Sequence, residues 1–381
     1  MDVKTAFLNR ELDEEIYMEQ PDGFVVNGQE SKQWHEKFDT TLTSAGFAIN
    51  EVDSCVYYRY GGGKRVILCL YVDDILIFGT DIDVINEVKS FLSSKFDMKD
   101  LGEADVILNI KLIKDESGIT LSQTQYVEKV LSRFGYIDSK PSSTSYDPSV
   151  TLKKNKRIGV NQLKYSQIIG SLIATRPDIS FAVSKLSRFM SNSGTDHWHA
   201  LERVMCYLKE MMSYGIHYSG HPAVLEGYSD ANWISDDELY ATSEYVFMLG
   251  GSAVSWRSCK QTILTRSIME AELAALDTAS VEADWLREFL MDLPVVEKPI
   301  PAILMNCDNQ TAIAKVNSDK ENAKSSRHVR RRVKSVRKMR HSGVISVTYI
   351  QTEKNLADPF TKGLSRNVID IASREMGMRP V

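Results

Sequence analysis

The sequence has few cysteines and no long uninterrupted apolar run, and both absences narrow the classes of protein that it can represent. Its 381 residues include five scattered cysteines, none of them in a CxxC pair. This usage suggests a reducing compartment and no zinc site. No stretch approaches the roughly 18 apolar residues of a membrane span. The acidic N-terminus also lacks the apolar core of a signal peptide.

The chain also lacks an overall excess of positive charge, because its formal net charge is −5. The distribution of charge matters more than the sum for a nucleic-acid partner. Residues 1–30 carry eight acids and two bases, whereas residues 327–341 carry eight Arg or Lys and no acid. With 43% hydrophobic and 25% charged residues, the chain has the composition of a soluble globular protein. Its length predicts two or three domains.

The stretch VILCLYVDDILIF, residues Val66–Phe78, places two acids between two short apolar runs. Such runs indicate buried strands, and a two-residue centre between them predicts a β-hairpin with Asp73 and Asp74 at its tip. Adjacent carboxylates repel each other, and a cation would offset the cost. Mg²⁺ takes one or two carboxylates with substrate phosphates. The alternative is a polar turn that uses aspartate twice.

YVDD followed by ILIFG resembles the catalytic hairpin of a reverse transcriptase, and MDVKTAFLNRELDEEIYMEQPDGF resembles a segment of copia-type retrotransposon polymerases. The resemblance implies that Asp2 joins Asp73 and Asp74 as the catalytic and metal-binding acids of the polymerase. It places Phe7 and Tyr71 at the nucleotide site, where a bulky ring at Phe7 excludes a 2′-hydroxyl. The alternative for Phe7 is an ordinary core residue.

The resemblance continues into an RNase H domain through the motifs YSDAN, AELAAL, CDNQTAI and NLADPFTK. It implies two Mg²⁺ or Mn²⁺ ions that serve hydrolysis of the RNA strand in an RNA–DNA hybrid. The implied catalytic and metal-binding residues are Asp230, Glu272, Asp308 and Asp358.

Each of these acids also has a structural explanation. Asp308 could cap the helix expected at residues 310–317, Asp358 could cap a turn near Pro359, and Asp230 could be a turn acid. Glu272 competes with Glu270, which fits an S-x-x-E capping box with Ser267 and so leaves Glu272 on another helix face. Four acids, each at a strand end or a helix start within its expected motif, favour the catalytic interpretation.

Residues 327–341 predict a basic helix, and the alternative to a binding role is a solvated face. We expect it to contact the backbone of the hybrid. The helix resembles the family's KHI motif only loosely at His328. The nucleic-acid-binding residues predicted here are Arg327, His328, Arg330, Arg331, Arg332 and Lys334.

The fold expected is α/β (α+β), a truncated reverse-transcriptase palm with part of a thumb and connection, then an RNase H-like domain. That domain should have a five-stranded mixed sheet and flanking helices. The expected parts are 1–138 (palm and thumb), 139–220 (linker and helical connection), 221–364 (RNase H-like) and 365–381 (C-terminal tail).

The partners implied are an RNA–DNA hybrid and a template-primer, with no membrane and no small-molecule cofactor beyond the metal and dNTP. The location implied is the cytoplasm, virus-like particles or the nucleus. Relatives carry a fingers region and an LYGLKQ-like stretch that this sequence lacks, so we expect no polymerase activity. The alternatives are a catalytically dead remnant, favoured by Glu244 and Glu210 where relatives usually have glycine, and a domesticated nucleic-acid-binding or interaction protein.

Overall fold

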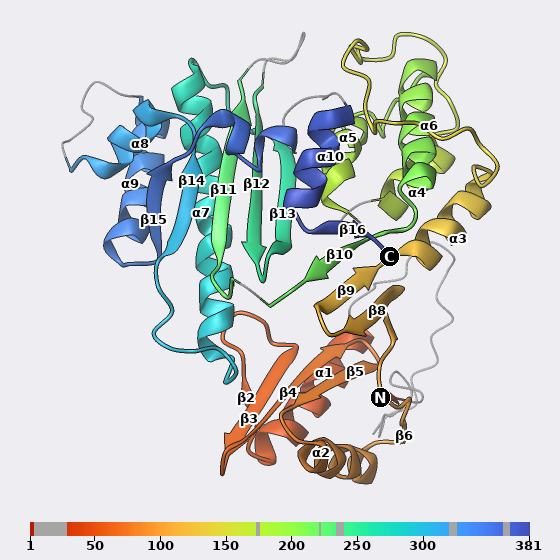
Figure 1. Ribbon diagram of the computed structural model, residues 1–381, viewed down its shortest axis with the longest axis vertical. Coiled ribbons are helices and arrows are strands. Elements are labelled where there is room, and N and C mark those ends of the chain that lie inside the picture. The colour runs from red at the N-terminus through yellow and green to blue at the C-terminus, as the bar shows by residue number, and fades with distance from the viewer. Residues whose placement is uncertain (4–28, 173–175, 221, 234–239, 320–325, 361–365) are drawn as a thin grey trace. The chain divides into compact units, whose positions relative to one another are not determined.

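The computed structural model describes residues 1–3, 29–172, 176–220, 222–233, 240–319, 326–360 and 366–381. The chain divides into two compact units, whose elements are labelled in Figure 1. Unit 1 contains Met1–Ala104 and Trp285–Ile300, and unit 2 contains Asp105–Asp284 and Pro301–Val381. The finer boundaries expected at residues 138, 220 and 364 stay a prediction. In the described ranges, every helix is too short or too polar to cross a bilayer.

Unit 1 is a six-stranded sheet with two helices and part of a third. Three aromatic or aliphatic side chains of the first helix, Trp34, Phe38 and Leu42, repeat at helical spacing and are buried in the core. The Asn50 side chain accepts hydrogen bonds from the Val52 and Asp53 amides, which forms a turn, and the next strand begins at Val56. In sheet order the strands are β2 (Ala48–Ile49), β3 (Val56–Gly61), β4 (Lys64–Tyr71), β5 (Asp74–Gly79), β1 (Asp2–Val3) and β6 (Met98–Lys99), with helices α1 (Gln29–Ser44) and α2 (Ile82–Lys95).

Unit 2 begins with a hairpin and a helical core. The expected linker lies between the first and second core helices and has neither helix nor strand between residues 140 and 160, but it buries Tyr146 and Leu152 in that core. It is therefore packed rather than free. The core helices are α3 (Thr124–Phe134), α4 (Gln162–Leu172), η1 (Pro177–Ile179), α5 (Ser180–Ser187) and α6 (Thr195–Glu210).

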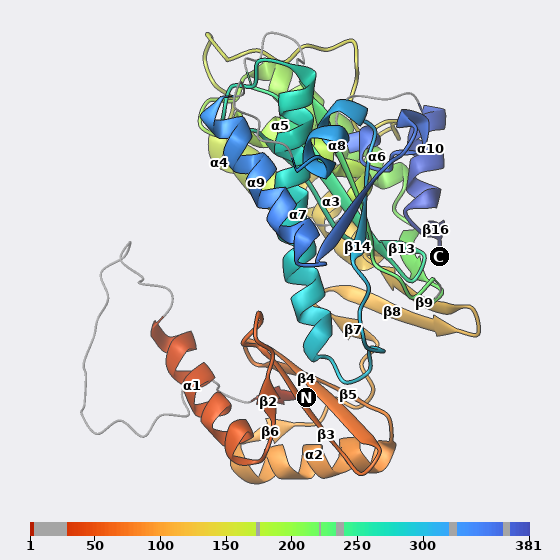
Figure 2. The same ribbon diagram turned by 90° about the vertical axis from the view of Figure 1, so that its left-hand side faces the viewer.

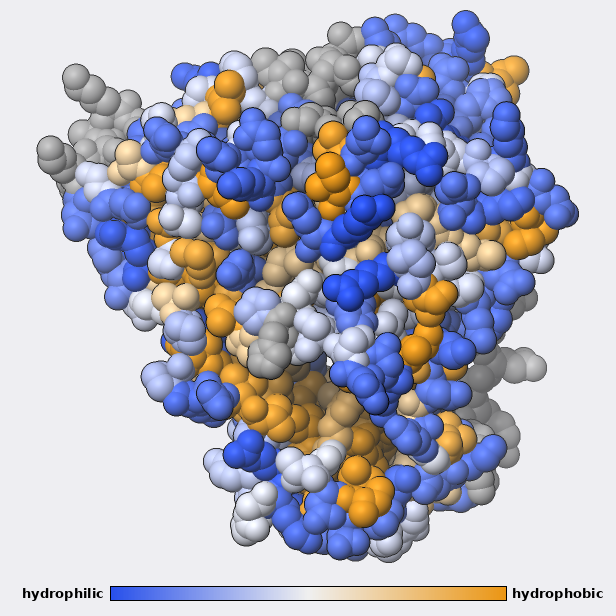
Figure 3. All heavy atoms as spheres, viewed as in Figure 1, coloured by the Kyte–Doolittle hydropathy of each residue, from blue (hydrophilic) through white to orange (hydrophobic). Residues whose placement is uncertain are grey.

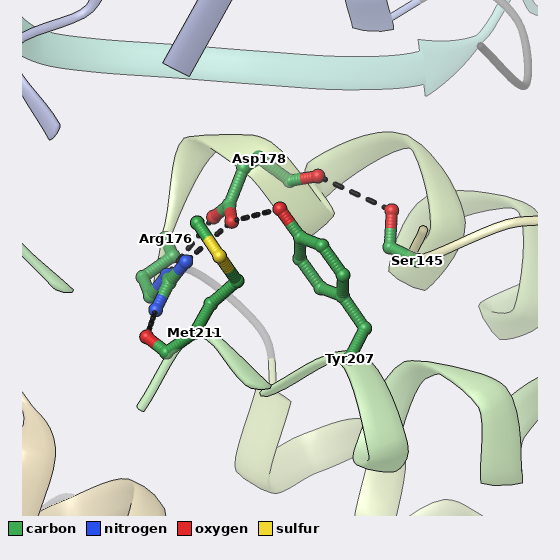
Figure 4. A network of polar contacts seen from close by, with 5 residues as sticks. All are labelled: Ser145, Arg176, Asp178, Tyr207 and Met211. Carbon is green, nitrogen blue, oxygen red and sulfur yellow. Dashed lines mark hydrogen bonds and ion pairs between the residues drawn. The ribbon is translucent and has the colours of Figure 1, made fainter. Parts of the chain in front are cut away.

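A buried ion pair fixes the start of α5 against the end of α6 (Figure 4). The Arg176 guanidinium donates to both carboxylate oxygens of Asp178, at 3.0 and 2.5 Å, and to the Met211 carbonyl at 2.5 Å. The Tyr207 hydroxyl donates to the same carboxylate at 2.8 Å, and the Ser145 hydroxyl donates to the Asp178 carbonyl at 3.4 Å. A buried pair needs such additional hydrogen bonds to offset the cost of desolvation.

A second sheet joins segments that lie far apart in the sequence. The strand β10 pairs with β9 on one side and with the C-terminal strand β16 on the other. The sequence was expected to end in a tail here, and Met376 and Met378 are instead buried. In sheet order the strands are β16 (Met378–Pro380), β10 (Tyr214–Tyr218), β9 (Gly118–Ser122), β8 (Ile110–Asp115) and β7 (Val106–Ile107).

The third sheet is the five-stranded mixed sheet that the sequence predicts. Its first three strands form an antiparallel meander, and two parallel strands extend the sheet beyond the first of them. The strands, in sheet order, are β13 (Ser252–Lys260), β12 (Thr242–Leu249), β11 (Glu226–Asn232), β14 (Ile303–Cys307) and β15 (Ile345–Tyr349). The helices around it are α7 (Ile268–Asp292), α8 (Gln310–Asn317), α9 (Arg327–His341), η2 (Thr352–Lys354), η3 (Asp358–Phe360) and α10 (Arg366–Glu375).

Helices cover both faces of this sheet. On one face Ala231 of β11 packs against Ala271 and Ala275 of α7, and α9 runs beside α7 (Figure 2). On the other face Tyr228 of β11 packs in a cluster with Ala372 of α10. Since side chains alternate along a strand, the odd and even positions of β11 face different helices. The parallel strands β11 and β14 lie next to each other and end at the same side of the sheet. Side chains at these two strand ends can therefore meet and form a site.

Candidate catalytic and nucleic-acid-binding sites

The parallel pairing of β11 and β14 brings two of the predicted acids to one edge of the sheet. Ser229 of β11 lies opposite Cys307 of β14, and each is followed by an aspartate, Asp230 and Asp308. Asp230 is only 5% exposed and lies within the strand. The interpretation of Asp230 as a turn acid is therefore wrong.

Helix α7 brings Glu272 to the same edge. A side-chain ligand atom each from Glu272, Cys307 and Asp308 lies within 4.8 Å of the others. Burial, followed by the negative charges of Asp230 and Asp308, raises the pKa of Glu272 to about 10. The charge of Asp358 acts in the same direction, so all four predicted acids meet around Glu272. One Glu272 oxygen, Oε2, is buried without a hydrogen-bond partner within the described residues.

The competing acid, Glu270, has a structural role instead. Its backbone amide donates to the Ser267 hydroxyl at 3.3 Å, and its carboxylate accepts from the Arg266 amide at 2.9 Å. This is the expected capping arrangement, displaced by one residue on the returning bond. Glu272 is thus left to face the sheet, as the sequence predicts, and is 3% exposed.

A short loop holds the last two acids in place, through residues that were not predicted to have a role. The Thr352 hydroxyl donates to the Asp308 carboxylate at 2.8 Å, and the Asn355 side chain donates to the Ser229 carbonyl at 3.0 Å. Asn355 also accepts from the Ala357 amide, next to Asp358. The polar run Gln351–Asn355, which ends three residues before Asp358, was the signal available in the sequence.

Helix α8 is capped by Asn309 rather than by Asp308. The Asn309 side chain accepts from the Ala312 amide at 2.9 Å, so the capping interpretation of Asp308 is wrong. Asp308 is thereby available to the acid cluster. Burial also raises the pKa of the neighbouring Cys307 thiol, which keeps that group neutral beside the carboxylates.

A fifth acid, Glu244, lies next to the cluster and was not among the predicted site residues. It pairs with Asp230 across β11 and β12 and is fully buried. Its Oε1 accepts from the Ser258 hydroxyl at 2.8 Å, and its Oε2 has no hydrogen-bond partner among the described residues. Burial raises the pKa of Glu244 well above its ordinary value, so the protonated form is favoured.

The basic helix α9 has the predicted bounds. Some of its basic side chains are exposed, whereas Arg332 faces another helix. Val329, Val333 and Val336 anchor it in the core. The side chain of Arg332 is turned toward α7, with its guanidinium 3.9 Å from the Asp277 carboxylate. Five of the six predicted nucleic-acid-binding residues are exposed, and hydrophilic side chains cover this part of the surface (Figure 3): Arg327, His328, Arg330, Arg331 and Lys334.

The polymerase hairpin is formed by β4 and β5, but its tip is displaced by one residue. Tyr71 pairs with Asp74, so the two loop residues are Val72 and Asp73 rather than the two aspartates. The expectation of Asp73 and Asp74 as the tip is therefore wrong. Val72 has a φ of 57°, which β-branched residues rarely adopt. Tyr71 is 57% exposed, and Phe7 lies outside the described residues.

The structure also brings the three predicted polymerase acids together. Asp2 of β1 pairs with Asp74 of β5, and the Val3 amide donates to the Asp73 carbonyl at 3.0 Å. Burial, followed by the charges of Asp73 and Asp2, raises the pKa of Asp74. A cation would relieve the same repulsion.

A hairpin with adjacent aspartates beside a third, and a mixed five-stranded sheet with converging acids, together define the class of retroelement polymerases with an RNase H-like part. A family model described as reverse transcriptase (RNA-dependent DNA polymerase) matches residues 1–148. The Pol polyprotein from transposon TNT 1-94 of Nicotiana tabacum is 36% identical over 99% of this chain and 30% of its own length. A transposon Ty5-1 protein of Saccharomyces cerevisiae is 32% identical over 68% of this chain and 92% of its own length.

The chain belongs to the Pol polyprotein family of copia-type transposons. It spans less than a third of the length of the TNT 1-94 polyprotein. Among solved structures, the N-terminal RNase H domain of a Mycobacterium tuberculosis protein covers 40% of this chain and 97% of that chain, with 10% identity and a TM-score of 0.28. The protease-reverse transcriptase of prototype foamy virus covers 90% and 62%, with 12% identity and a TM-score of 0.26. Scores this low add nothing to the topology described above.

Proposed function

We propose that unit 2 hydrolyses the RNA strand of RNA–DNA hybrids and that its four acids bind a divalent metal, Mg²⁺ or Mn²⁺. The observation that supports this most directly is the buried Glu272, which has one oxygen without a hydrogen-bond partner among the described residues and feels the negative charges of three other acids. Oxygen-rich sites of this charge suit hard divalent cations. When bound, such ions would lower the pKa of water and stabilise charge on the leaving oxygen. The metal-binding residues proposed are Asp230, Glu272, Asp308 and Asp358.

The chain's own contribution to this reaction is positioning. Thr352 holds the Asp308 carboxylate, and Asn355 ties the loop that carries Asp358 to β11. The backbone amide of Ala231 contributes a hydrogen bond to Glu272. Small displacements of reacting groups cost orders of magnitude in rate, so these bonds are needed for activity. The hybrid would be distinguished by its groove shape and 2′-hydroxyl groups rather than by its base sequence, with α9 contacting phosphates.

The test is cleavage of a labelled RNA–DNA hybrid by the full chain in Mg²⁺ and in Mn²⁺. Asp308→Asn should abolish cleavage while leaving the unfolding temperature nearly unchanged, because the substitution removes charge without changing packing. Asp319→Asn is the matched control, since this acid is exposed and its ion pair with Arg340 lies on the surface. Hybrid binding without cleavage by the unmodified chain would support the alternative of a dead remnant or a domesticated binding protein.

A polymerase site is the second candidate function, and the pairing of Asp2 with Asp74 favours it. We nevertheless expect no primer extension by this chain, because the sequence has no LYGLKQ-like stretch between Gly28 and Trp34. The assay is extension of a primer on a homopolymer template in Mg²⁺ or Mn²⁺. Processive synthesis that is lost in Asp73→Asn would show that the stretch is dispensable.

A further inference from the structure

We propose that the cavity between α5 and β13 binds one nucleotide, with its phosphate on Arg188 and Lys260 and its base against Trp256. The cavity has a volume of about 430 Å³, within the usual range for small-molecule sites. It lies wholly in unit 2, and the described residues that line it include no acidic side chain.

The two walls of the cavity present complementary polar groups. On α5, Ser180, Ser184 and Ser187 are four and three residues apart, so their hydroxyls share one helix face. On β13, Trp256, Ser258 and Lys260 alternate along the strand, so their side chains share one sheet face. The hydroxyl groups can bind a sugar, the cations can bind a phosphate, and the apolar surface of Trp256 can contact a base.

The cations of the cavity are held in position by their neighbours. Arg188 donates to the Thr242 hydroxyl at 3.2 Å, and the Lys260 ammonium lies 5.1 Å from the centre of the Tyr240 ring. Arg176, whose contacts with Asp178 are shown in Figure 4, also lines the cavity. Asp178 offsets the charge of Arg176, and we therefore assign the phosphate to Arg188 and Lys260, in addition to the contacts that these two side chains already make.

A continuous polar row joins the cavity to the acid cluster. Ser258, which lines the cavity, donates to Glu244, and Glu244 pairs with Asp230 on the next strand. A nucleotide in the cavity would therefore sit beside β13, with only β12 between that strand and β11, which carries Asp230. An aromatic surface with nearby cations accepts single-stranded bases without sequence preference, which makes an unpaired nucleotide a suitable ligand.

The experiment is calorimetric titration of the full chain carrying Asp308→Asn, so that cleavage does not interfere. The probes are deoxyadenosine monophosphate, deoxyadenosine, inorganic phosphate and a 5′-phosphorylated five-residue thymidine strand. We expect the monophosphate or the phosphorylated strand to bind more tightly than deoxyadenosine or phosphate alone. Binding of the monophosphate identifies a site for free nucleotides, and binding of the strand alone identifies a site for a strand end.

Two variants tie the binding to this cavity. Ser184→Leu should fill it and abolish binding, and Lys260→Gln should weaken binding about tenfold, as expected for removal of one charged partner. The controls are Ser132→Leu on α3 and the exposed Lys154→Gln, both outside the cavity. If Ser184→Leu does not fold, Lys260→Gln decides. Absence of binding for every probe, or equal affinity in the two cavity variants and the controls, would overturn the proposal.

Discussion

The buried acid Glu272 should make the metal-free protein less stable as the pH rises. Its pKa in the folded state is about 10, against an ordinary value of 4.5. Between these values the folded state binds one proton more than the unfolded state. The free energy of unfolding therefore falls as the pH rises, by at most about 1.4 kcal/mol per pH unit from this group, which is the value for a difference of one proton.

The assay is urea unfolding in EDTA at pH 6, 7 and 8, with the free energy of unfolding compared between variants. Glu272→Gln cannot titrate, so its stability should fall less steeply with pH than that of the unmodified chain. Glu288→Gln is the matched control, because Glu288 is exposed on the same helix α7. Glu244 contributes a slope of the same sign, and it is present in all three proteins.

Addition of Mg²⁺ should reduce the dependence on pH, because a cation bound to the cluster favours the ionised carboxylates. The unmodified chain should then gain more stability at pH 8 than Glu272→Gln does. Equal slopes for the unmodified chain and Glu272→Gln in EDTA would refute the reasoning. Such a result would mean that Glu272 ionises normally and is not surrounded by other acids.

Two further predictions follow from other parts of unit 2. Neutralising Arg330, Arg331 and Lys334 together should flatten the salt dependence of hybrid binding, by about 0.9 in the log–log slope for each phosphate that the helix no longer neutralises. An unchanged slope would identify the helix as a solvated face. Tyr207→Phe should lower the free energy of unfolding by about 2 kcal/mol in urea titrations, because the buried Asp178 carboxylate loses one of its hydrogen bonds and keeps only those from Arg176. Unchanged stability would show that the Tyr207 bond contributes nothing net.

The local sequence pattern was sufficient to predict the bounds of an element where a polar residue or a helix cap marks its ends. The bounds predicted for α8 and α9 agree with the structure. Each is an apolar or amphipathic run that ends at a polar residue or a cap. Of the acids of the second cluster, Asp308 follows the last residue of β14, whereas Asp230 lies inside β11; their catalytic role stays a prediction.

The misplaced features depend on interactions that a local pattern does not contain. The hairpin tip lies one residue earlier than predicted, at Val72 and Asp73. The local pattern did not indicate this, because Val72 must then adopt a positive φ that β-branched residues disfavour. Tyr146 and Leu152 are buried by helices distant in the sequence. Glu244 resembled a sign of decay, but it is a fully buried neighbour of Asp230 that hydrogen-bonds to Ser258.

The pairing of β16 with β10 has a consequence for the reading frame that encodes this chain. The final strand, Met378–Pro380, completes a sheet whose other strands were translated some 160 to 270 residues earlier. A stop codon at position 376 would spare every acid of the cluster around Glu272 and still remove this strand, together with the buried Met376 and Met378. An expression fragment that begins at residue 221 would likewise leave β16 without its partner, whereas one that begins at Asp105 retains the whole sheet.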